Sequence, residues 1–224
     1  MTLSSVKRLY YPNVRDKAGF MRLRNALSYI LFFLSLTSCA YAGASMYVKN
    51  SPEYIEGKVA RDVAVSVFDG RSLKEVAPSG GMFKASHGAT TGLYEVVFIT
   101  KEGFSPETVA LKAGESSGKI KLKPLQAMKD REKGILTGVV YKYVAGGKLK
   151  AHSGISVLFK GEKVTITKGD ASYTAVTDAT GVFMIELPAG EYEVALGNKK
   201  AGKAAVGQGK TTIKNLQKGI TLVD

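Results

Sequence analysis

"TDATGVFMIELPAGEYEV", residues 177–194, decides the fold of this chain. Phe183, Ile185 and Leu187 fall at every second position, and Tyr192 and Val194 repeat this spacing after a short break. A period of two is typical of a strand that buries one face. The stretch therefore predicts two short strands joined by a turn, and no segment of the chain shows a helical stripe of apolar residues.

Four residues of this stretch are predicted to shape its turns. The Asp178 carboxylate can accept hydrogen bonds from backbone N–H groups two residues on, and Gly181 can adopt the positive φ that ends the turn. Pro188 fixes φ at the second position of the next turn, with Gly190 at its fourth, a type I preference. A catalytic or metal-binding loop would need a second carboxylate or a histidine beside Asp178, so we interpret all four residues as structural.

The pattern occurs twice. Three landmarks recur in the same order, about one hundred residues apart. They are GMFKAS and GVFMIE, GLYEVVF and GEYEVAL, and GKIKL and KGITL, which begin at residues 81 and 181, 92 and 190, and 118 and 218. The sequence predicts an all-β protein of two tandem β-sandwich domains, 46–126 and 135–224, joined by a polar linker over 127–134.

The N-terminal region predicts export. Residues 22–42 contain a charged start (Arg22 and Arg24), an apolar run from 26 to 36, and the small-residue motif Ala40-Tyr41-Ala42. The run is shorter than the roughly 20 apolar residues that a membrane span needs. We expect residues 1–42 to be a signal segment. Translation from Met21 would place the two arginines at the usual distance from the terminus.

Cys39 is the single cysteine of the chain. Leu36-Thr37-Ser38-Cys39 resembles the bacterial lipobox, in which the cysteine is lipidated and becomes the first residue. Cleavage after Ala42 is the rival outcome, and the two stay open. In both cases we expect an exported protein without disulfides, periplasmic or extracellular, and attached to the outer membrane only through a lipid at Cys39.

The chain is strongly basic, with a net charge of +13, most of which lies beyond residue 42. This charge suits contact with anionic surface polymers, glycans or lipids. Nucleic acid is not expected as a partner, because the lysines are scattered and the N-terminal region predicts export.

Two motifs suggest enzyme chemistry without supporting it. AAVGQGKT, residues 204–211, satisfies a relaxed phosphate-loop pattern, but a strand-like segment follows it where that loop needs a helix. His87 and His152 stand one in each predicted domain, with no Cys, His or Glu at ligand spacing. We therefore predict no catalytic residue, no cofactor and no metal site, and a protein that is not an enzyme.

AVTDATGVFMIELPAGEYEVAL, residues 175–196, resembles the core signature of the carboxypeptidase regulatory-like family, and residues 138–159 resemble that family's opening strands. The first copy keeps the Gly-x-aromatic pairs at 81 and 92 and Gly103-Phe104, but PSGGMF replaces the Thr-Asp-x-x-Gly turn. The resemblance implies a transthyretin-like, immunoglobulin-like β-sandwich that acts as a non-catalytic accessory module. It names no ligand.

These observations predict a structural or binding module of the bacterial cell envelope that recognises a protein partner or a surface polymer. Exposed edge strands of small sandwiches offer main-chain hydrogen bonds to a partner strand. The alternative is a carbohydrate-binding protein, which usually shows rows of exposed aromatic residues. Tyr94 and Tyr192 are expected in the core, whereas Tyr141 and Tyr143 suit either the core or an exposed platform.

Overall fold

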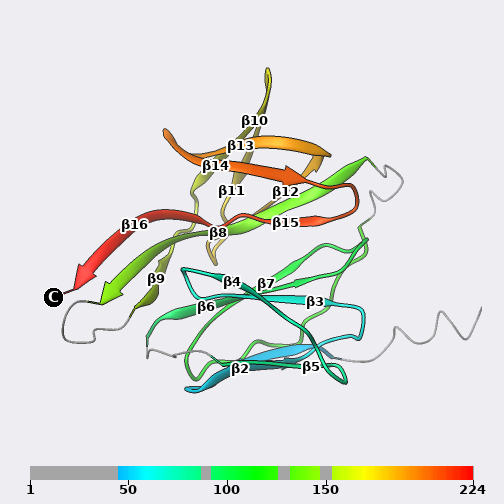
Figure 1. The fold of residues 1–224 in the computed structure, drawn as a ribbon, viewed down its shortest axis with the longest axis vertical. Coiled ribbons are helices and arrows are strands. Elements are labelled where there is room, and N and C mark those ends of the chain that lie inside the picture. The colour runs from blue at the N-terminus through cyan, green and yellow to red at the C-terminus, as the bar shows by residue number, and fades with distance from the viewer. Residues whose placement is uncertain (1–44, 87–91, 126–131, 147–152, 224) are drawn as a thin grey trace, which may run out of the picture. The chain divides into compact units, whose positions relative to one another are not determined.

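The computed structural model describes residues 45–86, 92–125, 132–146 and 153–223. Within these ranges the chain is built from strands and contains no helix. The strands pair mostly in antiparallel fashion (Figure 1). The apolar faces of the resulting sheets pack on one another. The predicted all-β sandwich class is confirmed.

Residues 45–125 contribute two sheets that enclose one core. The first has the order β1-β2-β5, and the strands are β1 (Tyr47–Asn50), β2 (Tyr54–Lys58) and β5 (Met82–Ser86). The second has the order β4-β3-β6-β7, and the strands are β3 (Ala64–Phe68), β4 (Leu73–Val76), β6 (Tyr94–Thr100) and β7 (Glu107–Lys112). Buried Val48, Ile55 and Phe83 from the first sheet pack with Val65, Val97 and Ile99 from the second.

Residues 153–223 repeat the strand order of the second sheet. The order β11-β10-β13-β14 joins β10 (Lys163–Lys168), β11 (Ala171–Val176), β13 (Gly190–Leu196) and β14 (Lys199–Val206). The inward side chains of these strands pack on β8 (Lys133–Gly146) and β12 (Val182–Pro188). The period of two read from the sequence places Phe183, Leu187, Tyr192 and Val194 in this core, each at most 1% exposed.

Strand β8 is the longest strand and has partners on both sides. Its first part pairs with β12, and in parallel fashion with β15 (Thr211–Ile213). Its second part pairs with β9 (Gly154–Leu158), and in parallel fashion with β16 (Leu216–Val223). Residues 134–141 are buried on both faces, because cores lie on either side of the strand.

A third apolar cluster joins the two parts of the described chain. It combines Phe68, Val96 and Phe98 with Val139, Tyr141, Tyr143 and Ile155. The Tyr141 hydroxyl donates a hydrogen bond to the Gly70 carbonyl (3.1 Å), and Phe68 meets the Tyr141 ring edge to face at 5.2 Å. A β-bridge between Tyr94 and Ile155 links β6 to β9, so one nine-stranded sheet runs through both parts.

The division into domains 46–126 and 135–224 stays a prediction. Residues 45–224 form one compact unit with three apolar clusters. Residues 127–131 of the predicted linker lie outside the described residues, whereas Lys133 and Gly134 already belong to β8. The predicted signal segment, with Met21, Cys39 and the cleavage motif, lies outside the described residues as well.

Candidate functional site

The first turn of the deciding stretch is held by one carboxylate oxygen. Asp178 Oδ1 accepts hydrogen bonds from the Thr180 N–H (2.8 Å), the Thr180 hydroxyl (2.7 Å) and the Val182 N–H (3.0 Å). Gly181 has φ +78°, and a Cβ there would lie 2.9 Å from Leu158 Cβ. Every polar contact described for Asp178 is thus made within its own turn.

The second predicted turn has a different geometry. Pro188 ends β12 and Gly190 begins β13, so only Ala189 lies between the two strands. Because β12 and β13 belong to different sheets, the chain passes between sheets here and does not form a four-residue type I turn. The Tyr192 hydroxyl donates a 2.6 Å hydrogen bond back to the Pro188 carbonyl and closes this corner.

The other residues singled out in the sequence do not gather into a site. His87, His152 and Cys39 lie outside the described residues. The Gly209 N–H donates to the Lys133 carbonyl (2.8 Å), and Thr211 opens strand β15, so the phosphate-loop-like segment leads into a strand.

The described residues contain neither a metal-ligating cluster nor a membrane-spanning helix. No group of three or more His, Cys, Asp or Glu residues is placed to hold a metal ion there. Within the same ranges, no helix has the length and hydropathy needed to cross a bilayer.

The tyrosine pair that the sequence left open belongs to the core. Tyr141 and Tyr143 are 6% and 5% exposed. Burial raises the pKa of the Tyr141 hydroxyl, and the nearby Tyr143 and Asp69 side chains add to this effect. Tyr192 is 1% exposed, so these three rings do not form an exposed stacking platform.

The most unusual surface feature is the outer edge of strand β16. Within the described residues β16 pairs with β8 alone, from Leu216 beside Val140 to Val223 beside Gly146. The register shifts between Gln217 and Gly219. Beyond this bulge the sequence is Gly-Ile-Thr-Leu-Val, residues 219–223, which contains no charge and no proline. An edge strand of this kind presents unpaired main-chain N–H and C=O groups.

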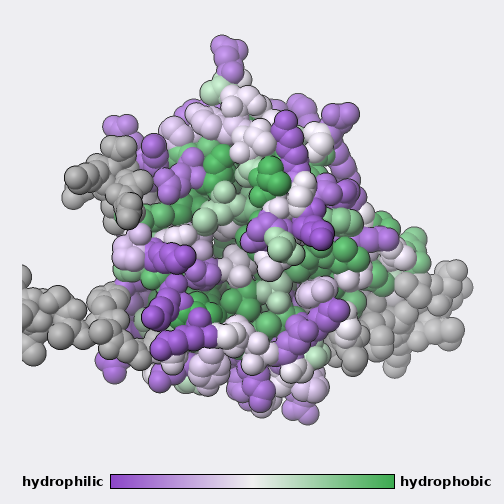
Figure 2. All heavy atoms as spheres, turned by 180° about the vertical axis from the view of Figure 1, so that it is seen from behind, coloured by the Kyte–Doolittle hydropathy of each residue, from purple (hydrophilic) through white to green (hydrophobic). Residues whose placement is uncertain are grey.

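Apolar side chains accompany this edge. Leu222 is 75% exposed and Ile220 is 54% exposed, the largest values among exposed large hydrophobic residues of the described chain apart from Val176. They occupy alternate positions, so both project from the same face of the strand. Hydrophobic residues reach the surface at the right of Figure 2, the end of the molecule at which Figure 1 shows β8 and β16 ending side by side.

The one charged residue of β16 is held away from the edge. Lys218 lies at the bulge, and its Nζ donates a 2.5 Å hydrogen bond to Glu162 Oε1. The same Nζ lies 4.6 Å from the centre of the Phe159 ring. Edge strands are commonly protected from pairing by a lysine on the edge. Because Lys218 is bound to the neighbouring turn, residues 219–223 lack that protection.

Comparisons with known proteins add little to this picture. No family model matches the chain, and no curated protein matches it. Among solved structures, the Bacillus anthracis TIE protein is similar at 13% sequence identity with a TM-score of 0.29, over 80% of this chain and 41% of that chain. The match thus spans less than half of that protein's length, and a TM-score of this size does not identify a common fold.

Proposed function

We propose that this chain is an exported, non-catalytic binding module of the bacterial cell envelope, and that it recognises a protein partner by pairing with it along β16. The observation that supports this most strongly is the open edge at residues 219–223 with exposed Ile220 and Leu222. A partner strand added there would form main-chain hydrogen bonds, and its alternate side chains would cover the two apolar residues.

The chemistry of the edge favours a polypeptide over a polysaccharide. A row of main-chain donors and acceptors at strand spacing complements another strand. A sugar polymer is usually bound by exposed aromatic rings, whereas Tyr141, Tyr143 and Tyr192 are buried. The chain contains no tryptophan.

Export and the accessory role belong to the same proposal. They are supported by the signal-like residues 22–42 and by the resemblance of residues 175–196 to the carboxypeptidase regulatory-like signature.

Capture of envelope proteins by edge variants tests the proposal. The purified chain is immobilised and exposed to envelope extract, and captured proteins are quantified by mass spectrometry. The double variant I220K/L222K places charge on both exposed positions of the edge, and we expect at least about a tenfold loss of the specific partner.

Val176→Lys is the matched control. Val176 is 59% exposed on β11, which is the edge strand of the β11-β10-β13-β14 sheet. This control should capture the partner as well as the unchanged chain does. Equal loss in both variants, or capture unaffected by I220K/L222K, would refute pairing at β16. Binding to purified surface polysaccharide in place of a protein would support the carbohydrate-binding alternative.

A further inference from the structure

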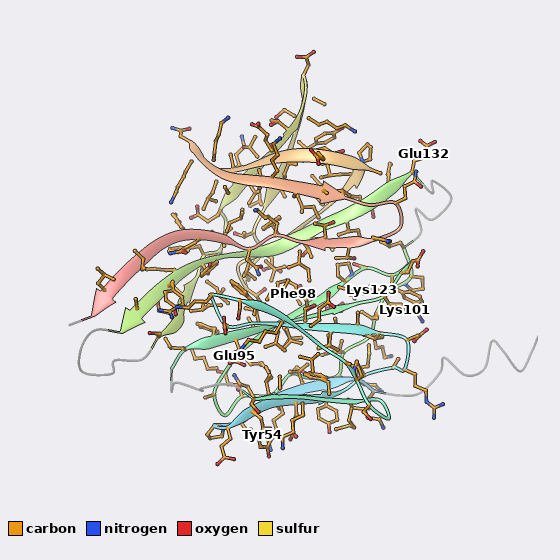
Figure 3. The ribbon with its side chains drawn as sticks, in the orientation of Figure 1. Tyr54, Glu95, Phe98, Lys101, Lys123 and Glu132 are labelled. Atoms are coloured by element: carbon orange, nitrogen blue, oxygen red, sulfur yellow. The ribbon has the colours of Figure 1, made fainter. Side chains whose placement is uncertain are left out.

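The open edge of β16 can pair with a copy of itself. Residues 219–223 read Gly-Ile-Thr-Leu-Val, with the exposed Ile220 and Leu222 on either side of Thr221. In Figure 3 β16 runs along β8 toward the C-terminal end of the chain, and within the described residues it pairs with β8 alone. The described part of the chain therefore leaves room for a further strand at this edge.

Two copies of β16 have one antiparallel register that matches their apolar side chains. A two-fold axis between the strands requires a register centred on a single residue. With Thr221 opposite Thr221, Ile220 of each copy stands opposite Leu222 of the other, on the same face of the sheet. A register centred on Ile220 would set Leu222 opposite Lys218. A register centred on Leu222 would set Ile220 opposite Asp224.

Charge does not oppose this contact, although the net charge of the whole chain is +13. The five paired residues are uncharged, and charges farther away than about 8 Å are largely screened at physiological ionic strength. Lys218 lies at the bulge on one side of these residues, and Asp224 follows them in the sequence. The two-fold arrangement therefore sets the basic end of each edge beside the acidic end of the other.

Two other outer strands suit self-pairing less well. Strand β14 carries three lysines, Lys199, Lys200 and Lys203, which would meet those of a second copy. Strand β11 is uncharged, but its most exposed apolar residue, Val176, shares its face with Thr174 and not with a second apolar side chain. The matched pair of apolar residues thus distinguishes β16 from both.

We propose that the strand that pairs with β16 is β16 of a second copy of this chain, antiparallel and centred on Thr221. This inference rests on the proposed function, since it names the partner at the same edge. Each copy contributes the same residues to the interface, so the contact closes as a dimer and does not grow into a fibre. In the dimer the sheet that contains β8 and β16 continues from one copy into the other.

Sedimentation velocity of the purified full chain over a range of concentrations tests the proposal. We expect a monomer–dimer equilibrium. In the proposed register I220K/L222K sets introduced lysines opposite each other, and it should weaken dimerisation at least about tenfold. I220K/L222E removes the same two apolar side chains, but each introduced lysine faces an introduced glutamate of the other copy. It should dimerise at least about tenfold more tightly than I220K/L222K.

Val176→Lys is the control on an uninvolved edge and should dimerise as the unchanged chain does. Far-UV circular dichroism should be the same for all variants, because the substituted side chains are exposed. A chain that stays monomeric at every concentration, equal association of the two double variants, or equal weakening by Val176→Lys would overturn the proposal.

The capture experiment separates this inference from the proposed function. If the second copy is the partner, the protein captured from the envelope extract and lost with I220K/L222K is this chain itself. If the chain is monomeric and I220K/L222K loses a different protein, the proposed pairing at β16 stands and the second copy is the wrong partner. If I220K/L222K changes neither capture nor association, both are wrong.

Discussion

Replacing Asp178 by alanine should destabilise the fold without touching the proposed binding edge. The substitution removes one oxygen that accepts three hydrogen bonds, from the N–H and hydroxyl groups of Thr180 and from the Val182 N–H. The backbone bonds of the turn remain, between the Asp178 N–H and the Val182 carbonyl (2.8 Å) and between the Gly181 N–H and the Asp178 carbonyl (3.1 Å).

The expected magnitude follows from the exposure of these groups. A typical intramolecular hydrogen bond contributes about 0.5–1.5 kcal/mol, and loss of a comparable helix cap costs about 1 kcal/mol. Asp178 and Thr180 are exposed, so water replaces part of what is lost. We expect a loss of about 1–2 kcal/mol, which for a unit of this size lowers the Tm by about 3–6 °C.

The assay is thermal unfolding of the unchanged chain and three variants, followed by circular dichroism. Asp178→Asn keeps an acceptor oxygen and should unfold close to the unchanged chain. Asp170→Ala makes the same truncation as Asp178→Ala at another exposed turn, where no side-chain hydrogen bond of Asp170 is described, and should also have little effect. If Asp178→Ala unfolds at the same temperature as Asp170→Ala, or if it abolishes capture of the partner at an unchanged Tm, our structural interpretation of this turn is wrong.

Three further predictions concern the core and its charge. Tyr192→Phe deletes the hydrogen bond to the Pro188 carbonyl and should cost about 1 kcal/mol, measured by urea unfolding. Gly138→Ala should prevent normal packing of β8, since its Cβ would collide with the Lys214 carbonyl, and overpacking of this kind costs about 1–3 kcal/mol or more; the Tm measures it. The raised pKa of Glu95, about 7 against an ordinary 4.5, means that the folded chain holds its proton more tightly than the unfolded chain. Stability from this group is therefore fully present below pH 4.5 and is lost as the pH rises through 7, so Glu95→Gln should flatten the fall in unfolding free energy between pH 5 and pH 8.

The strands of the second half could be predicted because their signal is local. Phe183, Leu187, Tyr192 and Val194 lie on the alternating inward positions of their strands, and each one is buried. Alternation of this kind depends only on which face of the strand meets the core. The sequence therefore predicts both the strand class and the inward residues, without knowledge of how the strands are ordered.

The pairing of β8 could not be predicted in the same way. Residues 134–141 are buried on both faces and show no alternation that would identify an inward side. Their partners on one side, β15 and β16, come from a distant segment, and nothing local specifies a parallel register. Whether Tyr141 and Tyr143 lie in the core or on an exposed platform therefore stayed open in the sequence. The answer depends on contacts with the other half, such as those of Tyr141 with Phe68 and Gly70.

The sequence indicates the proposed binding edge only weakly. Residues 218–222, KGITL, served as a landmark of the repeat, and the uncharged residues after Lys218, with β-branched Ile220 and Thr221, also suit an edge strand. That the edge is open depends on the topology, and that Lys218 is engaged depends on Glu162, which is distant in sequence.

The long separation between β8 and β16 has a consequence for the order of folding. The Val139 N–H donates to Asn215 Oδ1, a contact between residues 76 positions apart, and β16 follows directly. During synthesis β8 emerges well before the strands that cover this side of it. Until β15 and β16 pair with it, the edge of β8 is open to other chains. Because closing so long a loop is slow, the pairing of β8 with β15 and β16 is the folding step at which a chaperone would be most useful.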